Sequence, residues 1–188
     1  MQDPYDILVP KQGVIGDVLP VLQKRASLPD EIIEQIRFFE VHSGKVYKLL
    51  NQTYPVTNIN EFMTIYAERT PEEELRMDKD SPDHPICCFH YEKDPSRYHG
   101  VPFIFLLKEG EVFRETKERL SKRTGIKGKQ FDKVKFAVIR GGQTYARPAY
   151  VDDDDILSEK MSGDDQLGLE HLNKTRNPWA AHERLNIR

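Results

Sequence analysis

The chain has 188 residues, of which 38% are hydrophobic and 31% are charged. That is enough apolar material for a folded core, and the length suits one or two domains of ordinary size. The 28 basic and 31 acidic residues give a net charge of −3, whereas surfaces that bind nucleic acid or anionic membranes show a basic excess. The longest purely apolar run, residues 103–107, is too short to cross a bilayer. We therefore expect neither nucleic acid nor a membrane as a partner.

The chain contains two cysteines, Cys87 and Cys88, which are adjacent. Neighbouring residues on a strand point to opposite faces, so these two thiols are not expected to bond to each other. A chain without a disulfide framework suits a reducing compartment. We expect the protein in the nucleus, the cytoplasm or both.

Hydrophobic periodicity and turn residues divide the first half of the chain. The pattern predicts, in chain order, a strand over residues 5–10, a helix over 14–22, strands over 36–41 and 46–50, an apolar segment over 62–67 and a charged loop or linker over 71–85. Pro20 falls inside the helical stripe, where it should either kink the helix or lie near its first turn.

The second half predicts the same kinds of element in a similar order. They are strands over residues 86–91 and 101–107, a helix over 112–120, a strand over 134–139 and a short strand over 149–151. Asp94-Pro95 and Gly100 are expected to bracket a turn between the first two strands.

An internal repeat relates the two halves at a constant offset in sequence. Lys24-Arg25 aligns with Lys122-Arg123, Ile36-Arg37-Phe38 with Val134-Lys135-Phe136, and Gly44 with Gly142. The matches follow the core positions of the predicted helices and strands. We therefore expect an α+β fold made of two copies of one unit in tandem, with the order strand, strand, helix, strand, strand and a late short strand.

A hairpin followed by a helix and further strands resembles the ubiquitin-like β-grasp fold. Four stretches also resemble the C-terminal end of the herpesvirus-associated ubiquitin-specific protease family: His-Gly-Val-Pro-Phe at 99–103, Leu-Lys-Glu-Gly-Glu at 107–111, Lys-Gln-Phe-Asp-Lys-Val-Lys-Phe-Ala-Val at 129–138 and Leu-Gly-Leu-Glu-His-Leu-Asn-Lys at 167–174. In the first half, the Gly13 turn, the helix after it and the Phe38-Phe39 strand fit the same family.

The resemblance implies two ubiquitin-like domains, over residues 1–83 and 84–174, and a C-terminal tail over 175–188. Residues 87–109 leave room for two strands before the second copy's Gly110 turn, whereas residues 1–12 leave room for one before Gly13. The first domain is therefore expected to lack its opening strand. We expect the chain to be a fragment, a form with an alternative start or a truncated gene model.

The function that the resemblance implies is regulatory. The chain would be the C-terminal region of a cysteine-type deubiquitinase, activating the linked peptidase domain through its tail and docking ubiquitinated substrates or adaptor proteins. The alternative is a stand-alone ubiquitin-like interaction module or adaptor with no linked peptidase.

Three apolar residues of the tail, Trp179, Leu185 and Ile187, lie on a segment with no room to build a core. A frayed terminus is one interpretation. The resemblance implies the other, in which the tail docks on the catalytic domain and raises its activity. Asn177-Pro178-Trp179 departs from the family, which has an aromatic-rich stretch there.

No catalytic residue is expected on this chain. A thiol peptidase needs a thiolate, a histidine base and an orienting Asp or Asn, and Cys87 and Cys88 lie in a predicted strand without the family's cysteine and histidine boxes. We interpret both cysteines as small core residues. No cofactor is expected either.

No metal site is expected. His84, Cys87, Cys88, His90 and His99 lack the paired ligand spacing of structural zinc. Asp152 to Asp155 lack the alternating oxygens and the glycine of a calcium loop, and are interpreted as an acidic loop that caps a short helix at Ile156. A basic group, Lys122, Arg123, Lys127 and Lys129, is either a partner surface or, more commonly, a solvated face.

Overall fold

The computed structural model describes residues 7–141 and 147–173, and these mix helices and sheets in an α+β fold. They form two compact units, the first from residues 7–42 and 46–75 and the second mainly from residue 76 onward. Each unit has its own sheet and its own core. The domain boundary expected after residue 83 stays a prediction.

The first unit contains a three-stranded sheet in the order β2-β1-β3. Its elements are η1 (Ile15–Asp17), α1 (Val18–Ala26), α2 (Asp30–Ile33), β1 (Ile36–His42), β2 (Lys45–Leu50), η2 (Val56–Asn58), β3 (Thr64–Arg69) and α3 (Glu72–Leu75). Pro20 lies in the first turn of α1, where a missing N–H leaves no helical hydrogen bond unmade. Val18 and Phe38, both fully buried, join the helix to the central strand.

The strand expected over residues 5–10 is not found in its described part. Residues 7–10 belong to no strand, although Ile7 is buried in the first unit's core. Strands exist only through pairing with a neighbour, and none of the described strands pairs with this segment. The apolar periodicity identified Ile7 as a core residue, but it carries no information on whether another strand pairs with residues 7–10.

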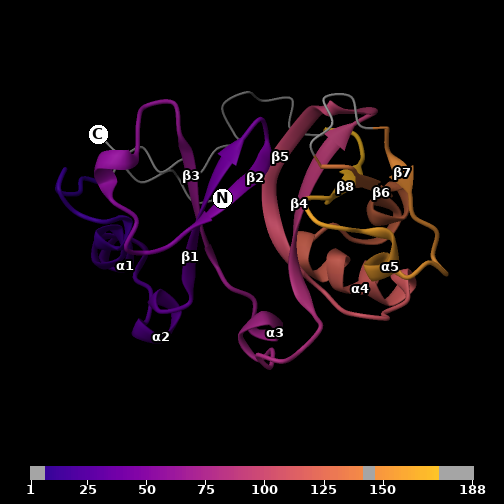
Figure 1. The fold of residues 1–188 in the computed structure, drawn as a ribbon, viewed down its shortest axis with the longest axis horizontal. Helices are drawn as coiled ribbons and strands as arrows, with labels where there is room; N and C mark the ends of the chain where they lie inside the picture. Colours follow the sequence, from indigo (N-terminus) through magenta and orange to yellow (C-terminus); the bar gives the residue numbers. More distant parts are fainter. Residues whose placement is uncertain (1–6, 142–146, 174–188) are drawn as a thin grey trace. The chain divides into compact units, whose positions relative to one another are not determined.

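The second unit contains a five-stranded sheet in the order β5-β4-β8-β6-β7, coloured from magenta to yellow in Figure 1. Its elements are β4 (His84–Glu92), β5 (Asp94–Leu107), α4 (Phe113–Thr124), η3 (Gly128–Lys133), β6 (Lys135–Ile139), β7 (Ala149–Tyr150), α5 (Leu157–Lys160) and β8 (Gln166–Glu170). The strands predicted over 86–91, 101–107, 134–139 and 149–151 correspond to β4, β5, β6 and β7.

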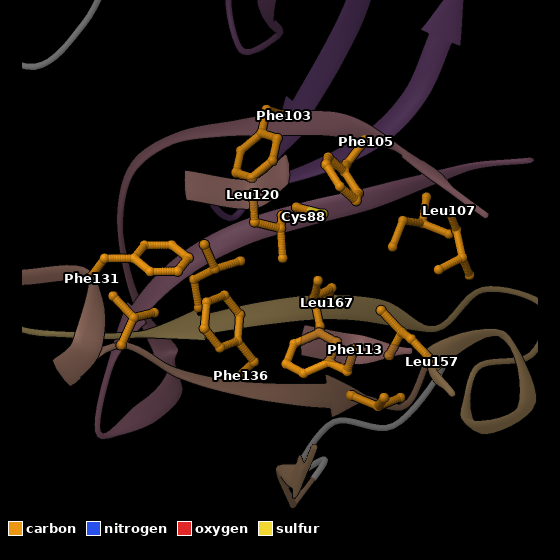
Figure 2. Packing of buried hydrophobic residues seen from close by; sticks show 14 residues of the cluster. Cys88, Phe103, Phe105, Leu107, Phe113, Leu120, Phe131, Phe136, Leu157 and Leu167 are labelled. Carbon is orange, nitrogen blue, oxygen red and sulfur yellow. The ribbon is translucent and has the colours of Figure 1, made fainter. Parts of the chain in front are cut away.

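One face of this sheet packs against α4. Phe113 and Leu120 from the helix are fully buried among sheet residues, and the Phe113 and Phe136 rings meet edge to face with centroids 5.3 Å apart. Figure 2 shows these side chains gathered with Cys88 and Leu167 in one cluster. The helix ends at Gly125, whose left-handed φ of 69° lets its N–H bond back to the carbonyl of Ser121.

The turn expected between Asp94 and Gly100 is wrong. Residues 94–100 are part of β5, and the hairpin turns one residue earlier, at Lys93, which has a φ of 64°. Gly100 has a φ of 66°, and the pairing register of β4 and β5 shifts between Cys88 and His90. Gly100 therefore lies at an irregularity inside a long hairpin, which local sequence signals do not distinguish from a turn.

The late short strand expected at the end of the repeat unit had no predicted position in the second copy. The structure has β8 there, and β8 is the middle strand of the sheet. It pairs parallel to β4 and antiparallel to β6. A Cβ atom on Gly168 would come within 2.7 Å of the Tyr91 ring and 3.1 Å of the Ile139 side chain. Glycine lowers the strand propensity of a sequence. Here its lack of a side chain leaves room for the Tyr91 and Ile139 side chains.

Candidate functional site

The described residues end at Asn173, shortly after β8 and shortly before the predicted tail over residues 175–188. The His171 N–H donates to the Tyr91 carbonyl at 3.0 Å, which extends the β4 pairing one residue beyond the strand. We call residues 171–173 the tail root. Trp179, Leu185 and Ile187 lie outside the described residues, so their proposed role rests on sequence.

Three histidines from different strands meet at the tail root. His90 comes from β4, His99 from β5 and His171 from the end of β8. The ring centroids lie 5.0 Å apart for His90 and His171, 4.7 Å for His99 and His171, and 6.0 Å for His90 and His99. We call them the histidine cluster.

Hydrogen bonds connect the histidine cluster to the backbone of the tail root. The His99 Nε2 lies 3.1 Å from the His171 carbonyl, and the His171 Nδ1 lies 3.2 Å from the Leu172 carbonyl. Carbonyls only accept, so both nitrogens carry protons. The His171 Nε2 lies 2.9 Å from the His90 Nδ1, in a hydrogen bond whose donor is set by the tautomers of the two rings. The cluster thus connects both hairpin strands, β4 and β5, to the tail root.

Burial keeps His90 neutral. Desolvation, followed by the positive charge that His171 and His99 would carry, lowers the pKa of His90 from 6.5 to about 3. The ring also packs 5.7 Å from that of Phe103. At neutral pH the His90 ring is therefore uncharged.

The zinc ligands considered from sequence are not brought together. Cys88 is buried in the core of the second unit, and His84 is exposed at the start of β4. His90 and His99 join His171 instead, and their facing nitrogens are used in hydrogen bonds. Across residues 7–141 and 147–173, no group of three or more His, Cys, Asp or Glu side chains could hold a metal ion.

Beside the tail root is a cavity of about 460 Å³, lined by exposed lysines. Lys93 reaches it from the hairpin turn, Lys129 and Lys133 from η3, and Lys135 from β6. We call it the lysine pocket.

The rest of the lining of the lysine pocket is mixed. Ile126 and Leu172 contribute apolar surface, and His171 connects the pocket to the histidine cluster. Glu92 and Glu170 also line it. Glu170 already accepts a hydrogen bond of 2.6 Å from the Tyr150 hydroxyl.

The basic group identified from sequence contributes one residue to the lysine pocket. Of its four members only Lys129 lines the lysine pocket, and the Arg123 guanidinium lies over the Phe103 ring at 5.4 Å. Sequence reasoning missed Lys93, which comes from a distant hairpin. Lys133 and Lys135 alternate with buried Val134, and this pattern could have identified both lysines as members of an exposed basic surface.

The acidic residues 152–155 form a loop that holds the start of α4. The Phe113 and Arg114 N–H groups donate to the carbonyls of Asp155 and Asp153 at 2.8 and 3.0 Å. The Asp153 carboxylate lies 2.9 Å from the Lys117 ammonium. Bonds from the Lys160 side chain and the Asp152 N–H lower the pKa of Asp155. These aspartates therefore stabilise a helix start.

The two cysteines occupy different environments in β4. Cys88 is 1% exposed within the main core, Cys87 is partly exposed, and neither forms a disulfide. In the described part of the chain, no helix is long and apolar enough to cross a membrane.

Comparison with known proteins gives one consistent family. The family model described as ubiquitin-specific protease C-terminal matches residues 1–176. Ubiquitin carboxyl-terminal hydrolase 15 of Schizosaccharomyces pombe is 36% identical over 168 residues, covering 88% of this chain. Ubiquitin C-terminal hydrolase 12 of Arabidopsis thaliana is 32% identical over 195 residues, covering 95%. Ubiquitin carboxyl-terminal hydrolase 7 of Drosophila melanogaster is 23% identical over 185 residues, covering 88%. The chain spans 15 to 17% of the length of these relatives.

Proposed function

We propose that this chain, which belongs to the ubiquitin-specific protease C-terminal family, is the regulatory region of a cysteine-type deubiquitinase and activates its peptidase domain through the tail. The match to hydrolases that are several times longer supports a linked peptidase over a stand-alone adaptor. Docking of ubiquitinated substrates or adaptor proteins is the second part of the proposal.

The architecture we propose is a tandem of β-grasp units. In support, α1 ends at Ala26 and α4 at Thr124, 98 residues later, and each helix precedes the middle strand of a β2-β1-β3 or β7-β6-β8 arrangement. Each unit also has one isolated antiparallel β-bridge at a similar position in its sequence, Val14 to Pro55 in the first and Val112 to Ile156 in the second.

The first unit is proposed to lack the opening strand that β4 supplies in the second. Its described strands, β1 to β3, correspond to β6, β7 and β8, and none of them corresponds to β4 or β5. In the second unit β4 is the strand that pairs with β8.

The observation that carries the proposed activation is the way in which the tail is attached. The tail root follows a strand paired on both sides and is fixed further by the histidine cluster. A short tail starting from a rigid point samples a restricted volume, so a site within its reach sees an effective concentration near the millimolar range. A tail that binds weakly as a free peptide can then act within one molecule.

Activation also requires a preference between two states of the peptidase. A tail with equal affinity for the resting and active conformations would shift nothing. We therefore propose that Trp179, Leu185 and Ile187 contact the active conformation, because burial of apolar side chains is the largest favourable contribution that this segment can make.

A chimeric enzyme tests this proposal. This chain replaces the matching C-terminal region of the fission yeast hydrolase 15, and kcat/KM is measured on a fluorogenic ubiquitin substrate. We expect Leu185→Ala/Ile187→Ala, and a chain ending at Lys174, to lower kcat/KM by about tenfold, which corresponds to about 1.4 kcal/mol.

The matched control for the chimera is Thr175→Ala/Asn177→Ala, which changes polar residues of the same tail and should preserve activity. Unchanged kcat/KM in both the double variant and the truncated form would remove the tail from the mechanism. Equal losses in the control and the apolar variant would show that the identity of Leu185 and Ile187 does not matter, and would also contradict the proposal.

A further inference from the structure

We propose that the lysine pocket is a binding site for an acidic peptide segment of a partner protein, with an aliphatic side chain of that segment seated between its carboxylates. This site is separate from the tail residues and does not depend on the proposed activation. Its case rests on the excess of lysines, the mixed lining and the composition of the neighbouring tail.

The lysines around the pocket outnumber the carboxylates of its wall, which are Glu92 and Glu170. Lys93, Lys129, Lys133 and Lys135 form no ion pair with a described carboxylate, whereas Lys117 and Lys160 elsewhere in the unit each lie 2.9 Å from an aspartate oxygen. The Lys135 ammonium lies 5.7 Å from the centroid of the Tyr150 ring, and this cation–π contact does not neutralise the lysine charge. Like charges that converge on one cavity favour an anionic occupant.

The apolar and acidic residues that also line the pocket favour a peptide anion over a nucleic acid or a polyphosphate. Ile126 lies partly buried against the core, and Leu172 is 67% exposed, so the pocket offers apolar contact beside its charges. Glu92 and Glu170 add two negative charges to the wall. A nucleic acid or polyphosphate, with closely spaced charges and no aliphatic group, would meet repulsion here and leave the apolar surface unused. A peptide can space its carboxylates around these two glutamates.

The chain's own tail does not match the pocket in charge. Residues 174–188 contain one acidic residue, Glu183, against four basic ones, Lys174, Arg176, Arg184 and Arg188. The tail therefore has the same sign as the lysines, and charge complementarity points to an acidic segment from another protein.

Binding to the 188-residue chain can be measured with three fluorescein-labelled probes in fluorescence anisotropy. The first is an acidic peptide of the sequence Glu-Asp-Glu-Leu-Asp-Glu. The second carries Gln and Asn in place of Glu and Asp, and the third is a single-stranded DNA of the same number of units. We expect saturable binding of the acidic peptide that weakens as salt rises, and at least tenfold weaker binding of the other two probes.

The variants are Lys129→Gln/Lys133→Gln in the pocket and Lys122→Gln/Lys127→Gln as a control that removes the same charge nearby. Circular dichroism establishes that each variant is folded. We expect about a tenfold rise in the peptide's Kd for the pocket variant and less than twofold for the control. Equal rises in both would show attraction to net charge alone and overturn the site. Tighter binding of the DNA, lost in the pocket variant, would overturn the peptide as occupant.

Discussion

The Nδ1 of His90 lies 2.9 Å from the Nε2 of His171, and this hydrogen bond joins the buried strand β4 to the tail root. The His171 ring turns its other nitrogen toward the Leu172 carbonyl. The side-chain bond thus acts on the same residue whose backbone N–H is held by Tyr91. The tautomers of the two rings decide which nitrogen donates.

The first prediction is that stability falls in acid because of His90. Its pKa in the folded protein is about 3, against 6.5 ordinarily. The unfolded chain therefore takes up a proton below pH 6.5 that the folded chain refuses until about pH 3. The contribution of neutral His90 to the free energy of unfolding is complete above pH 6.5 and is lost as pH falls toward 3. Between pH 7 and 5 the loss is roughly 2 kcal/mol, measurable by urea unfolding at each pH.

The variant His90→Asn separates this effect from other titrations. Its amide places a donor near the position of Nδ1 but does not titrate, so the slope of stability against pH between 6 and 4 should become shallower by roughly 1.4 kcal/mol per pH unit. The control His84→Asn changes an exposed histidine of the same strand and should keep the slope. A slope that is the same in His90→Asn as in the parent chain would contradict the prediction.

The second prediction concerns the close contact of Gly168 with Tyr91. Gly168→Ala should lower the free energy of unfolding of the second unit by about 1 to 3 kcal/mol, because the added methyl overlaps a ring in a packed sheet. Guanidinium unfolding followed by circular dichroism measures the change. In a double-mutant cycle with Tyr91→Leu, the glycine substitution should become less harmful, and full additivity would show that the ring is not the cause.

The third prediction is that the first unit opens before the second. Phe38 in β1 and Phe136 in β6 are both buried on strands that have a neighbour on each side. The first unit's described sheet has three strands against five in the second, and fewer paired strands give less cooperative protection. Hydrogen exchange should therefore show weaker protection for the Phe38 amide than for the Phe136 amide. Equal protection in the monomeric chain would rule this out.

The elements that local pattern predicted well are those whose signals are local. The helix predicted over residues 112–120 is found as α4, because the apolar spacing that predicts it lies within the helix's own sequence. The strand over 134–139 is found as β6 for the same reason, with Phe136 and Val138 facing the core.

The errors arise where pairing with a distant strand decides the structure. Residues 7–10 have an apolar pattern but no partner strand in the described structure, whereas β8 has two partners but a weak pattern around Gly168. The sequence predicts a turn at Gly100, where the structure has an irregularity inside β5, because glycine with a positive φ is typical of both turns and strand irregularities. Strand formation depends on hydrogen bonds that are remote in sequence.

The sequence by itself determined the family, the α+β class and the apolar residues of the tail, because motifs and periodicity are carried by neighbouring residues. Only the tertiary structure decided that His90, His99 and His171 meet at the tail root, and that Lys93 joins Lys133 and Lys135 around one cavity. Residues 90–99, 133–135 and 171 lie in or beside different strands, and the order of those strands in the sheet places them together. Sequence spacing carries no information about such distances, since the register of strand pairing sets them.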